Sequence, residues 1–293
     1  MYRPELAVDV DCIIGEGPVW DERDGSLYFI DILGRCMHRF DGNRAEKLLQ
    51  FDQSIGFAVL RENGGVVAGL QDGFYFADPK TGSFENVGDP EPGRAEGRFN
   101  DGKVDPAGSV WGGTKPTSLD TGYGEAGPDS GLYCMDENRS IRTMLTGVIQ
   151  GNGLAWSADT KKFYFIDTQR HCVQEFDYDI SENVLTGGRV CVDVPASEGI
   201  PDGMTIDDEG KIWVALWGGR RVVRFDPASG QAVGQVELPA LNVTSCCFGG
   251  KNMDELYITT ANLNTDKTEY PHAGSVFVVR PGVTGAPSWR YRG

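Results

Sequence analysis

The sequence predicts an all-β protein that folds as a six-bladed β-propeller. Three observations lead to this prediction: a strand-rich phrase recurs six times, 40 glycines are scattered through 293 residues without long runs, and no segment shows a sustained helical period. Glycine is about twice as frequent as the usual share of roughly 7%, which indicates many tight turns between short strands. We expect residues 1–293 to form one domain, because closed all-β folds of this length are commonly single units.

The repeated phrase is a glycine-led strand followed by two further short strands. In the first copy, Gly17-Pro18-Val19-Trp20 leads to Leu27-Tyr28-Phe29-Ile30-Asp31 and then to Cys36-Met37-His38-Arg39-Phe40. The copies begin near Gly17, Gly56, Gly102, Gly153, Gly203 and Ser245. One such sheet cannot bury both of its faces, and radial stacking of six sheets does so. A β-sandwich, the alternative, does not explain the sixfold repeat.

The N-terminal alternation of apolar and polar residues over 5–10 predicts a strand that completes the last blade and closes the ring. The N-terminus lacks the pattern of a signal peptide, and no apolar run is long enough to span a membrane. Seven cysteines without a C-x-x-C spacing indicate buried thiols in a reducing compartment. We therefore expect a cytoplasmic protein and leave its oligomeric state open.

The net charge of −16 makes some partners improbable. It arises from 27 basic and 43 acidic side chains, which repel the phosphate backbone of nucleic acids and the headgroups of anionic lipids. Neither nucleic acid nor a membrane is expected as a partner. The chain also lacks the G-x-S-x-G, G-x-x-x-x-G-K-[ST] and H-E-x-x-H motifs, so the usual markers of serine hydrolases, nucleotide-binding loops and zinc proteases are missing.

One phase of the repeat carries polar side chains that should meet on the propeller axis. The residue before the leading glycine is polar in four copies: Glu16, Asp101, Asn152 and Asp202. Asp-Gly and Asn-Gly are also common turn pairs, which is the alternative explanation for each residue taken singly. Together, however, they would bring like charges onto one axis, which is costly unless a cation lies among them. This phase therefore predicts a metal site on the central axis.

The predicted metal ligands are oxygen atoms, because His38, His171 and His272 all lie outside this phase. Carboxylate and amide oxygens suit calcium, magnesium or manganese, and zinc or iron(II) can also accept them. The residue pattern leaves the choice among these divalent ions open.

A long insertion between strands, Pro116 to Ser130, is expected to cover the channel mouth and to influence which substrate is accepted. Within it, Gly122 to Gly127 matches G-x-G-x-x-G, but a strand follows where a dinucleotide site needs a helix. We therefore interpret this match as part of a loop.

Five phrases of the chain stand out: residues 15–20 (GEGPVW), 98–108 (RFNDGKVDPAG), 152–157 (NGLAWS), 201–204 (PDGM) and 244–250 (TSCCFGG). They resemble the senescence marker protein, regucalcin and gluconolactonase family of six-bladed propellers. The resemblance extends over nearly the whole chain, and the phrases together are highly specific. It implies a metal-dependent hydrolase that converts a sugar (aldono) lactone into the sugar acid. The hydrolase is expected to hold one divalent ion, and calcium and zinc are the first candidates, ahead of manganese, magnesium and iron(II).

The resemblance also implies roles for individual residues. The implied metal ligands are Glu16, Asn152 and Asp202, which the phase of the repeat also selects. Arg98 and Asn100 are implied to bind substrate, which leaves Asp101 either as a ligand or as a residue behind the ligands. In the mechanism we expect, the ion polarises the lactone carbonyl and Asp202 is the catalytic base toward water.

One departure from the family concerns substrate choice. Vertebrate members carry an acidic residue for substrate shortly after the Gly-Thr that matches Gly113-Thr114, whereas this chain has Lys115-Pro116-Thr117-Ser118. The resemblance therefore supports lactone hydrolysis more firmly than one particular sugar. Two alternatives stay open: a non-catalytic calcium-binding regulator, and a phosphotriesterase-like or non-sugar-lactone hydrolase.

Overall fold

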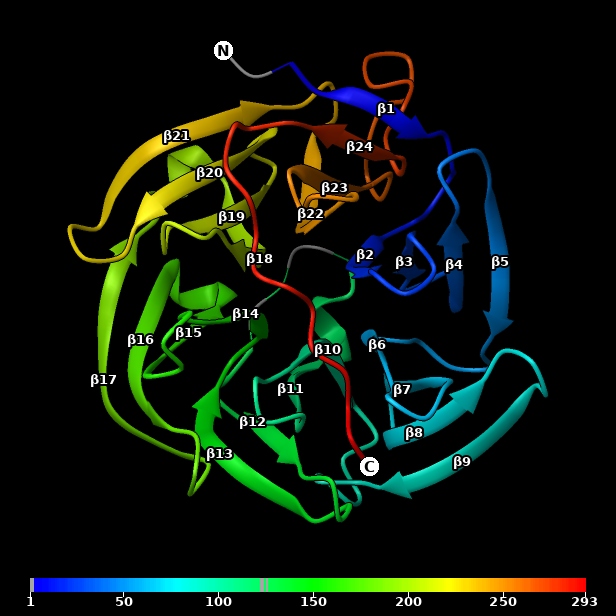
Figure 1. Cartoon of the computed structure of the whole chain (residues 1–293), viewed down its shortest axis with the longest axis vertical. Coiled ribbons are helices and arrows are strands. Elements are labelled where there is room, and N and C mark those ends of the chain that lie inside the picture. Colours follow the sequence, from blue (N-terminus) through cyan, green and yellow to red (C-terminus); the bar gives the residue numbers. More distant parts are fainter. Residues whose placement is uncertain (1–2, 122–123, 125) are drawn as a thin grey trace.

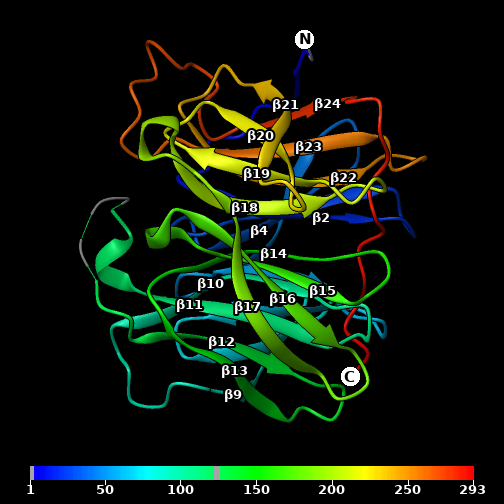
Figure 2. The same ribbon diagram turned by 90° about the vertical axis from the view of Figure 1, so that its left-hand side faces the viewer.

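The computed structural model describes residues 3–121, 124 and 126–293. Within these residues the strands form six four-stranded antiparallel sheets, arranged radially around a central channel (Figure 1). This confirms the predicted six-bladed β-propeller. The helical turn at residues 117–119 and the C-terminal tail lie on opposite faces of the ring (Figure 2).

The first three blades run outward from the channel in chain order. Blade 1 consists of β2 (Gly15–Asp21), β3 (Ser26–Asp31), β4 (Cys36–Phe40) and β5 (Ala45–Gln50). Blade 2 consists of β6 (Phe57–Leu60), β7 (Val66–Leu70), β8 (Gly73–Asp78) and β9 (Ser83–Gly88). Blade 3 consists of β10 (Gly97–Val104), β11 (Val110–Pro116), β12 (Ser130–Met135) and β13 (Ile141–Val148).

The remaining blades follow the same plan until the last. Blade 4 consists of β14 (Gly151–Trp156), β15 (Lys162–Asp167), β16 (Cys172–Asp179) and β17 (Val184–Asp193). Blade 5 consists of β18 (Ile200–Ile206), β19 (Ile212–Trp217), β20 (Arg221–Asp226) and β21 (Gln231–Glu237). Blade 6 consists of β22 (Asn242–Gly249), β23 (Glu255–Ala261), β24 (Val276–Val279) and β1 (Glu5–Val8). Short 3-10 turns occur at η1 (Thr117–Leu119), η2 (Thr168–Arg170) and η3 (Ala196–Glu198).

The N-terminal strand closes the ring, as the alternation in the sequence predicts. β1 pairs antiparallel with β24, and Glu5 lies opposite Val278. The first strand of the chain is therefore the outer strand of the last blade, and this pairing joins the two ends of the chain in one sheet.

Irregular pairing recurs where the inner strands carry their polar side chains. In five blades the register between the inner strand and its neighbour shifts around the position of the repeat that precedes the leading glycine. The shifts lie at Glu16/Val19, Phe99/Asp101, Asn152/Leu154, Pro201/Met204 and Val243/Ser245. A β-bulge leaves an extra residue unpaired and turns its side chain out of the regular alternation. The repeated bulge thus accounts for polar side chains that face the axis rather than the core between the blades.

The leading glycines lie inside strands, where they permit close packing near the axis. A Cβ atom on Gly203 would lie 2.1 Å from Ser245 Oγ of the neighbouring inner strand, and one on Gly102 would lie 2.5 Å from the Phe57 ring. The alternative explanation, in which these glycines only form turns, is therefore wrong for these two positions.

The C-terminal tail runs across one face of the ring (Figure 1). Tyr291 is fully buried there, and its hydroxyl donates to the Asp136 carbonyl oxygen at 2.7 Å.

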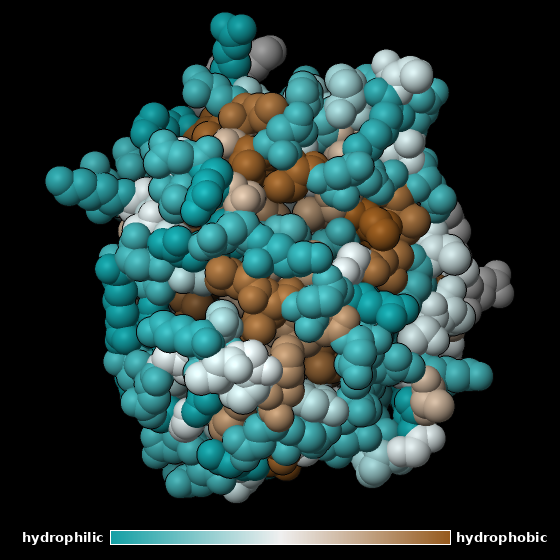
Figure 3. All heavy atoms as spheres, turned by 90° about the vertical axis from the view of Figure 1, so that its right-hand side faces the viewer, coloured by the Kyte–Doolittle hydropathy of each residue, from teal (hydrophilic) through white to brown (hydrophobic). Residues whose placement is uncertain are grey.

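The outer surface beside blades 1 and 2 is mostly hydrophilic, with apolar groups interrupted by polar side chains (Figure 3). All seven cysteines are buried free thiols, as expected. No helix in the described part of the chain is long and apolar enough to cross a bilayer.

Candidate active site

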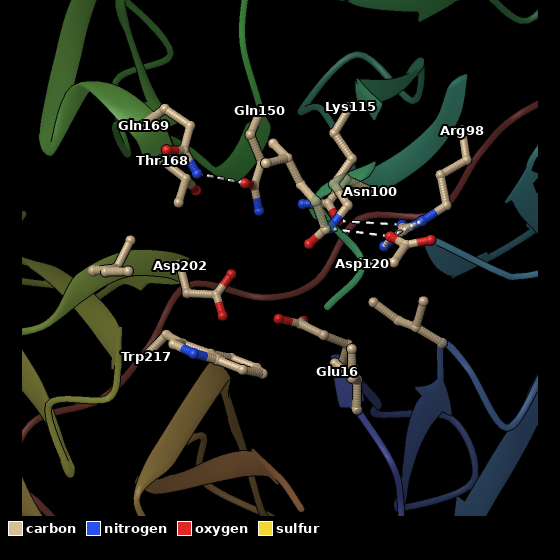
Figure 4. A pocket seen from close by; sticks show the side chains of 14 residues that line it. Glu16, Arg98, Asn100, Lys115, Asp120, Gln150, Thr168, Gln169, Asp202 and Trp217 are labelled. Carbon is tan, nitrogen blue, oxygen red and sulfur yellow. Dashed lines mark hydrogen bonds and ion pairs between the residues drawn. The ribbon is translucent and has the colours of Figure 1, made fainter. Parts of the chain in front are cut away.

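A pocket of about 560 Å³, including the solvent at its opening, lies on the side of the ring where the segment after β11 begins (Figure 4). Its walls come from the inner strands, from the ends of the second strands β11 and β19, and from the loops that precede inner strands or follow second strands. The polar lining residues are Glu16, Arg98, Asn100, Lys115, Asp120, Gln150, Thr168, Gln169 and Asp202. The apolar lining residues are Ile14, Ile32, Leu119, Ile200 and Trp217. Four of the five residues predicted for the site therefore line one pocket.

Two carboxylates from different blades point into the pocket. Glu16 on β2 and Asp202 on β18 approach its centre from neighbouring walls (Figure 4). Burial raises the pKa of Glu16 well above its usual range, and repulsion from Asp202 and Asp101 adds to the shift. Burial likewise raises the pKa of Asp202 to about 7, with repulsion from Asp101 as a further cause. The site thus concentrates negative charge where little water can screen it.

Asn152, the fifth predicted residue, lies directly beside Asp202. Its amide nitrogen donates to an Asp202 carboxylate oxygen and, at 3.0 Å, to the Thr168 hydroxyl. The Asn152 amide oxygen accepts from the Gly153 backbone N–H at 3.2 Å. In this arrangement the nitrogen faces Asp202, so coordination of a cation through the Asn152 oxygen requires the amide group to turn.

Asp101 is buried behind the pocket wall, and its carboxylate accepts from the Gly102 backbone N–H at 2.7 Å. Burial raises its pKa, while the positive charge of Lys103 acts in the opposite direction. Asp101 adds to the negative potential at Glu16 and Asp202. Of its two predicted roles, this position fits a residue behind the ligands better than a direct ligand.

The three predicted ligands fit a hard divalent cation by the chemistry of their atoms. Glu16 and Asp202 provide carboxylate oxygens whose repulsion a cation would remove, and Asn152 provides an amide oxygen. Within the described ranges, no three His, Cys, Asp or Glu side chains form a metal cluster by themselves. A bound ion would therefore depend on the amide and on water for its remaining ligands.

Arg98 and Asn100, the two predicted substrate-binding residues, both lie on β10 and line the pocket. Arg98 Nη1 donates to the Phe99 carbonyl oxygen at 2.7 Å and to Asn100 Oδ1 at 3.2 Å. Asn100 Nδ2 donates to the Gly151 carbonyl oxygen at 3.0 Å, which joins blade 3 to blade 4. Much of the hydrogen-bonding capacity of this pair is therefore used within the protein.

Two charged residues of the pocket do not belong to the predicted set. Asp120 follows η1, and its Oδ1 lies 2.7 Å from Arg98 Nη2 and 3.2 Å from Lys115 Nζ. Lys115 on β11 is buried, and its Nζ also donates to the Leu119 carbonyl oxygen at 3.2 Å. An acidic residue thus does reach the pocket from the segment after Gly113-Thr114, although later in the chain than the family pattern implies.

The start of the insertion from Pro116 to Ser130 borders the pocket. Leu119 and Asp120 line it, and Asn264 of blade 6 donates from Nδ2 to the Thr121 carbonyl oxygen at 2.8 Å. Residues 122, 123 and 125, on which the match to G-x-G-x-x-G depends, lie outside the described residues. The predicted position beside the channel mouth therefore holds for residues 119–121.

Comparison with known proteins identifies the family and agrees with the propeller fold. A family model described as the SMP-30/Gluconolactonase/LRE-like region matches residues 14–262. The chain belongs to this family. The SMP-30/gluconolactonase-like proteins that it resembles include the regucalcin of Danio rerio, which is 38% identical over 98% of this chain and 99% of its own.

Two further relatives bear different functional names. A Bacillus subtilis (strain 168) protein, named provisionally as the sugar lactone lactonase YvrE, is 36% identical over 93% of this chain and 92% of its own. The solved structure of a regucalcin from Agrobacterium tumefaciens str. C58, described as a calcium-binding protein, superposes with a TM-score of 0.91 at 25% identity, over 99% and 98% of the two chains. Membership of the SMP-30/gluconolactonase-like family indicates a hydrolase, and the regucalcin names also fit a calcium-binding role.

Proposed function

We propose that the protein hydrolyses a sugar lactone to the sugar acid with one divalent metal ion held by Glu16, Asn152 and Asp202. The observation that carries this proposal is the pair of buried carboxylates, Glu16 and Asp202, inside a pocket whose other walls are polar. Two carboxylates with raised pKa values need a counter-charge, and a lactone carbonyl needs an electrophile beside it. A divalent cation at this point satisfies both requirements.

The reaction adds water across the ester bond of the lactone. The water oxygen bonds to the carbonyl carbon, the bond from that carbon to the ring oxygen breaks, and the ring oxygen leaves as a hydroxyl group after taking up a proton. When bound, the ion polarises the carbonyl as a Lewis acid. Asp202 accepts the proton of the attacking water, and a neighbouring cation favours the ionised form that this role requires.

The hydroxyl groups of the substrate are recognised by amides and a hydroxyl around the pocket. Gln150, Gln169 and Thr168 line the wall opposite Arg98, and Gln169 Nε2 donates to Gln150 Oε1 at 3.1 Å (Figure 4). Side-chain amides both donate and accept hydrogen bonds, as sugar hydroxyls do. With nine polar residues among fourteen, the lining favours a hydroxyl-bearing lactone over the apolar substrate of a phosphotriesterase-like enzyme.

A calcium-binding regulator is the second candidate, favoured by the same acidic pair and by the calcium-binding regucalcin relative. The two candidates differ in turnover. Metal-loaded protein should be assayed by continuous titration of released acid with a panel of 1,4- and 1,5-aldonolactones, with Asp202→Ala as the inactive control. Enzyme-dependent acid release from at least one lactone supports the hydrolase, and tight calcium binding with no release from any lactone supports the regulator.

A further inference from the structure

Two buried cations of the pocket share a single carboxylate. Asp120 Oδ1 accepts from Arg98 Nε at 2.9 Å and Nη2 at 2.7 Å, and the same oxygen lies 3.2 Å from Lys115 Nζ. Arg98 is 1% exposed and Lys115 is 4% exposed. Lysine is almost never buried at this level unless it is paired, and one carboxylate balances only one of the two charges. This wall of the pocket therefore carries one more positive than negative charge, and the other carboxylate that acts on Lys115, Asp202, is a proposed metal ligand.

The ammonium group of Lys115 faces the pocket and retains a hydrogen-bond donor. An ammonium group has three N–H donors, and the interactions of Lys115 with Leu119 and Asp120 account for two of them. A side chain that served only to hold Asp120 in place would not be needed, because Arg98 already holds that carboxylate through two hydrogen bonds. Apart from its hydrogen bond to the Leu119 carbonyl oxygen, the second cation thus fills no structural role that Arg98 does not already fill.

The charged residues of the pocket are also divided between two sides. Glu16 and Asp202 lie on one side, whereas Lys115, Asp120 and Arg98 lie together on the other (Figure 4). With a divalent ion between the two carboxylates, the charged lining residues and the ion together leave one positive charge. A substrate with a single negative charge would neutralise the filled pocket, provided that this charge lies away from the lactone carbonyl.

We propose that the substrate is a sugar lactone that carries a carboxylate of its own, and that Lys115, assisted by Arg98, binds that carboxylate. This inference rests on the proposed lactonase function. An aldaric acid lactone has the required form, because its carbonyl and its free carboxylate lie at opposite ends of the carbon chain. The carbonyl end lies beside Glu16 and Asp202, and the carboxylate end lies beside Lys115. Hydrolysis of such a lactone yields a dicarboxylate.

The test compares two lactones that differ in one group. Galactaro-1,4-lactone carries a terminal carboxylate where galactono-1,4-lactone carries a hydroxymethyl group. We expect the parent protein to have a kcat/KM at least about 10-fold higher for the first, and Lys115→Met to reduce that ratio about 10- to 100-fold, the size expected of a charged hydrogen bond. Lys162→Met, which removes a surface lysine paired with Asp177, is the matched control and should leave the ratio unchanged.

A second measurement does not depend on turnover. Calorimetric binding of galactarate and galactonate, the two products, should show tighter binding of the dicarboxylate to the parent and a loss of this preference in both Lys115→Met and Lys115→Gln. If the protein hydrolyses neutral lactones, and its kcat/KM for the carboxylate-bearing lactone is equal or lower, the inference is overturned and the proposed function stays intact. Absence of turnover with every lactone rejects the proposed function, and equal binding of the two products would then reject the inference as well.

Discussion

Arg98 and Asp120 are joined by two hydrogen bonds to one carboxylate oxygen, although they are 22 residues apart in the chain. The contact links the inner strand β10 to the segment that follows η1, which forms part of the pocket wall. Because Arg98 also donates to Phe99 and Asn100, its guanidinium group is held from two sides. Arg98 therefore positions the pocket wall and also lines the proposed substrate site.

Removal of the shared carboxylate should destabilise the protein. In Asp120→Asn, the charges of Arg98 and Lys115 remain buried without a counter-ion, and we expect the free energy of unfolding to fall by about 1–3 kcal/mol. Urea denaturation measures this change. Asp226→Asn, which removes a half-exposed partner of Lys211, is the control and should cost less than about 1 kcal/mol. Equal effects of the two substitutions would contradict the view that Asp120 balances a buried cation pair.

Replacement of Arg98 should affect the substrate more than the metal. In Arg98→Ala, we expect KM for a lactone to rise about 10-fold or more, because Asp120 and Asn100 each lose a charged hydrogen-bond partner at the pocket wall. Metal affinity should stay close to that of the parent, since Arg98 contacts none of the three proposed ligands in the described structure. Steady-state kinetics and a metal titration provide the two readouts, and an unchanged KM would place Arg98 outside the substrate site.

Two substitutions of Asp202 separate its two proposed roles. Asp202→Ala should abolish turnover and weaken metal binding, because it removes both a charged ligand and the proposed base. Asp202→Asn keeps an oxygen that can bind the ion but cannot accept a proton, so we expect retained metal with turnover reduced at least about 100-fold. If Asp202→Asn kept both metal and near-full turnover, another group would have to be the base.

The preference for a carboxylate-bearing lactone should depend on pH through Lys115. Burial lowers the pKa of Lys115 to about 7, with Arg98 acting in the same direction and Asp120 and Asp202 opposing it. Because the ammonium form binds the carboxylate, the ratio of kcat/KM for carboxylate-bearing over neutral lactone should fall as the pH rises from about 6 to about 8. Lys115→Met should give a flat profile over this range, and a parent ratio that rose with pH would contradict the assignment.

The lowered pKa of Lys115 also predicts how stability depends on pH. The contribution of Lys115 to the free energy of unfolding should rise with pH, whereas the ratio of kcat/KM should fall. The unfolded chain keeps the Lys115 proton up to a pH of about 10.4, whereas the folded protein loses it near 7, so the unfolded state binds more protons between these values. The contribution of Lys115 to the free energy of unfolding should therefore increase with pH across this window. Denaturation at several pH values should show that Lys115→Met gains stability over the parent below about pH 7 and that this gain shrinks as the pH rises.

The repeat made the fold and the axial residues predictable. Glu16, Asn152 and Asp202 occupy one phase of a pattern with a period of about 40 to 50 residues, so the sequence alone indicates that they meet, and the recurrent bulge explains how. Lys115 lies on β11 directly opposite Arg98, so their proximity follows from strand pairing, which the repeat pattern does not specify in register. The position of Asp120 follows from how one insertion turns after β11, and its contact with Arg98 is a tertiary contact that periodicity cannot indicate. The orientation of the Asn152 amide depends in the same way on Thr168 of another loop.

The most direct test of the central claim is a metal titration of lactone hydrolysis. The protein is stripped with a chelator and reloaded with calcium, zinc, manganese, magnesium or iron(II) singly, while acid release and ion binding are measured on the same samples. We expect activity to be absent in the stripped protein and to return in proportion to one bound ion per chain, and Glu16→Gln with Asp202→Asn to bind that ion much more weakly. Full activity in the stripped protein, or an ion that binds equally well to this double variant, would contradict a catalytic metal held by Glu16, Asn152 and Asp202.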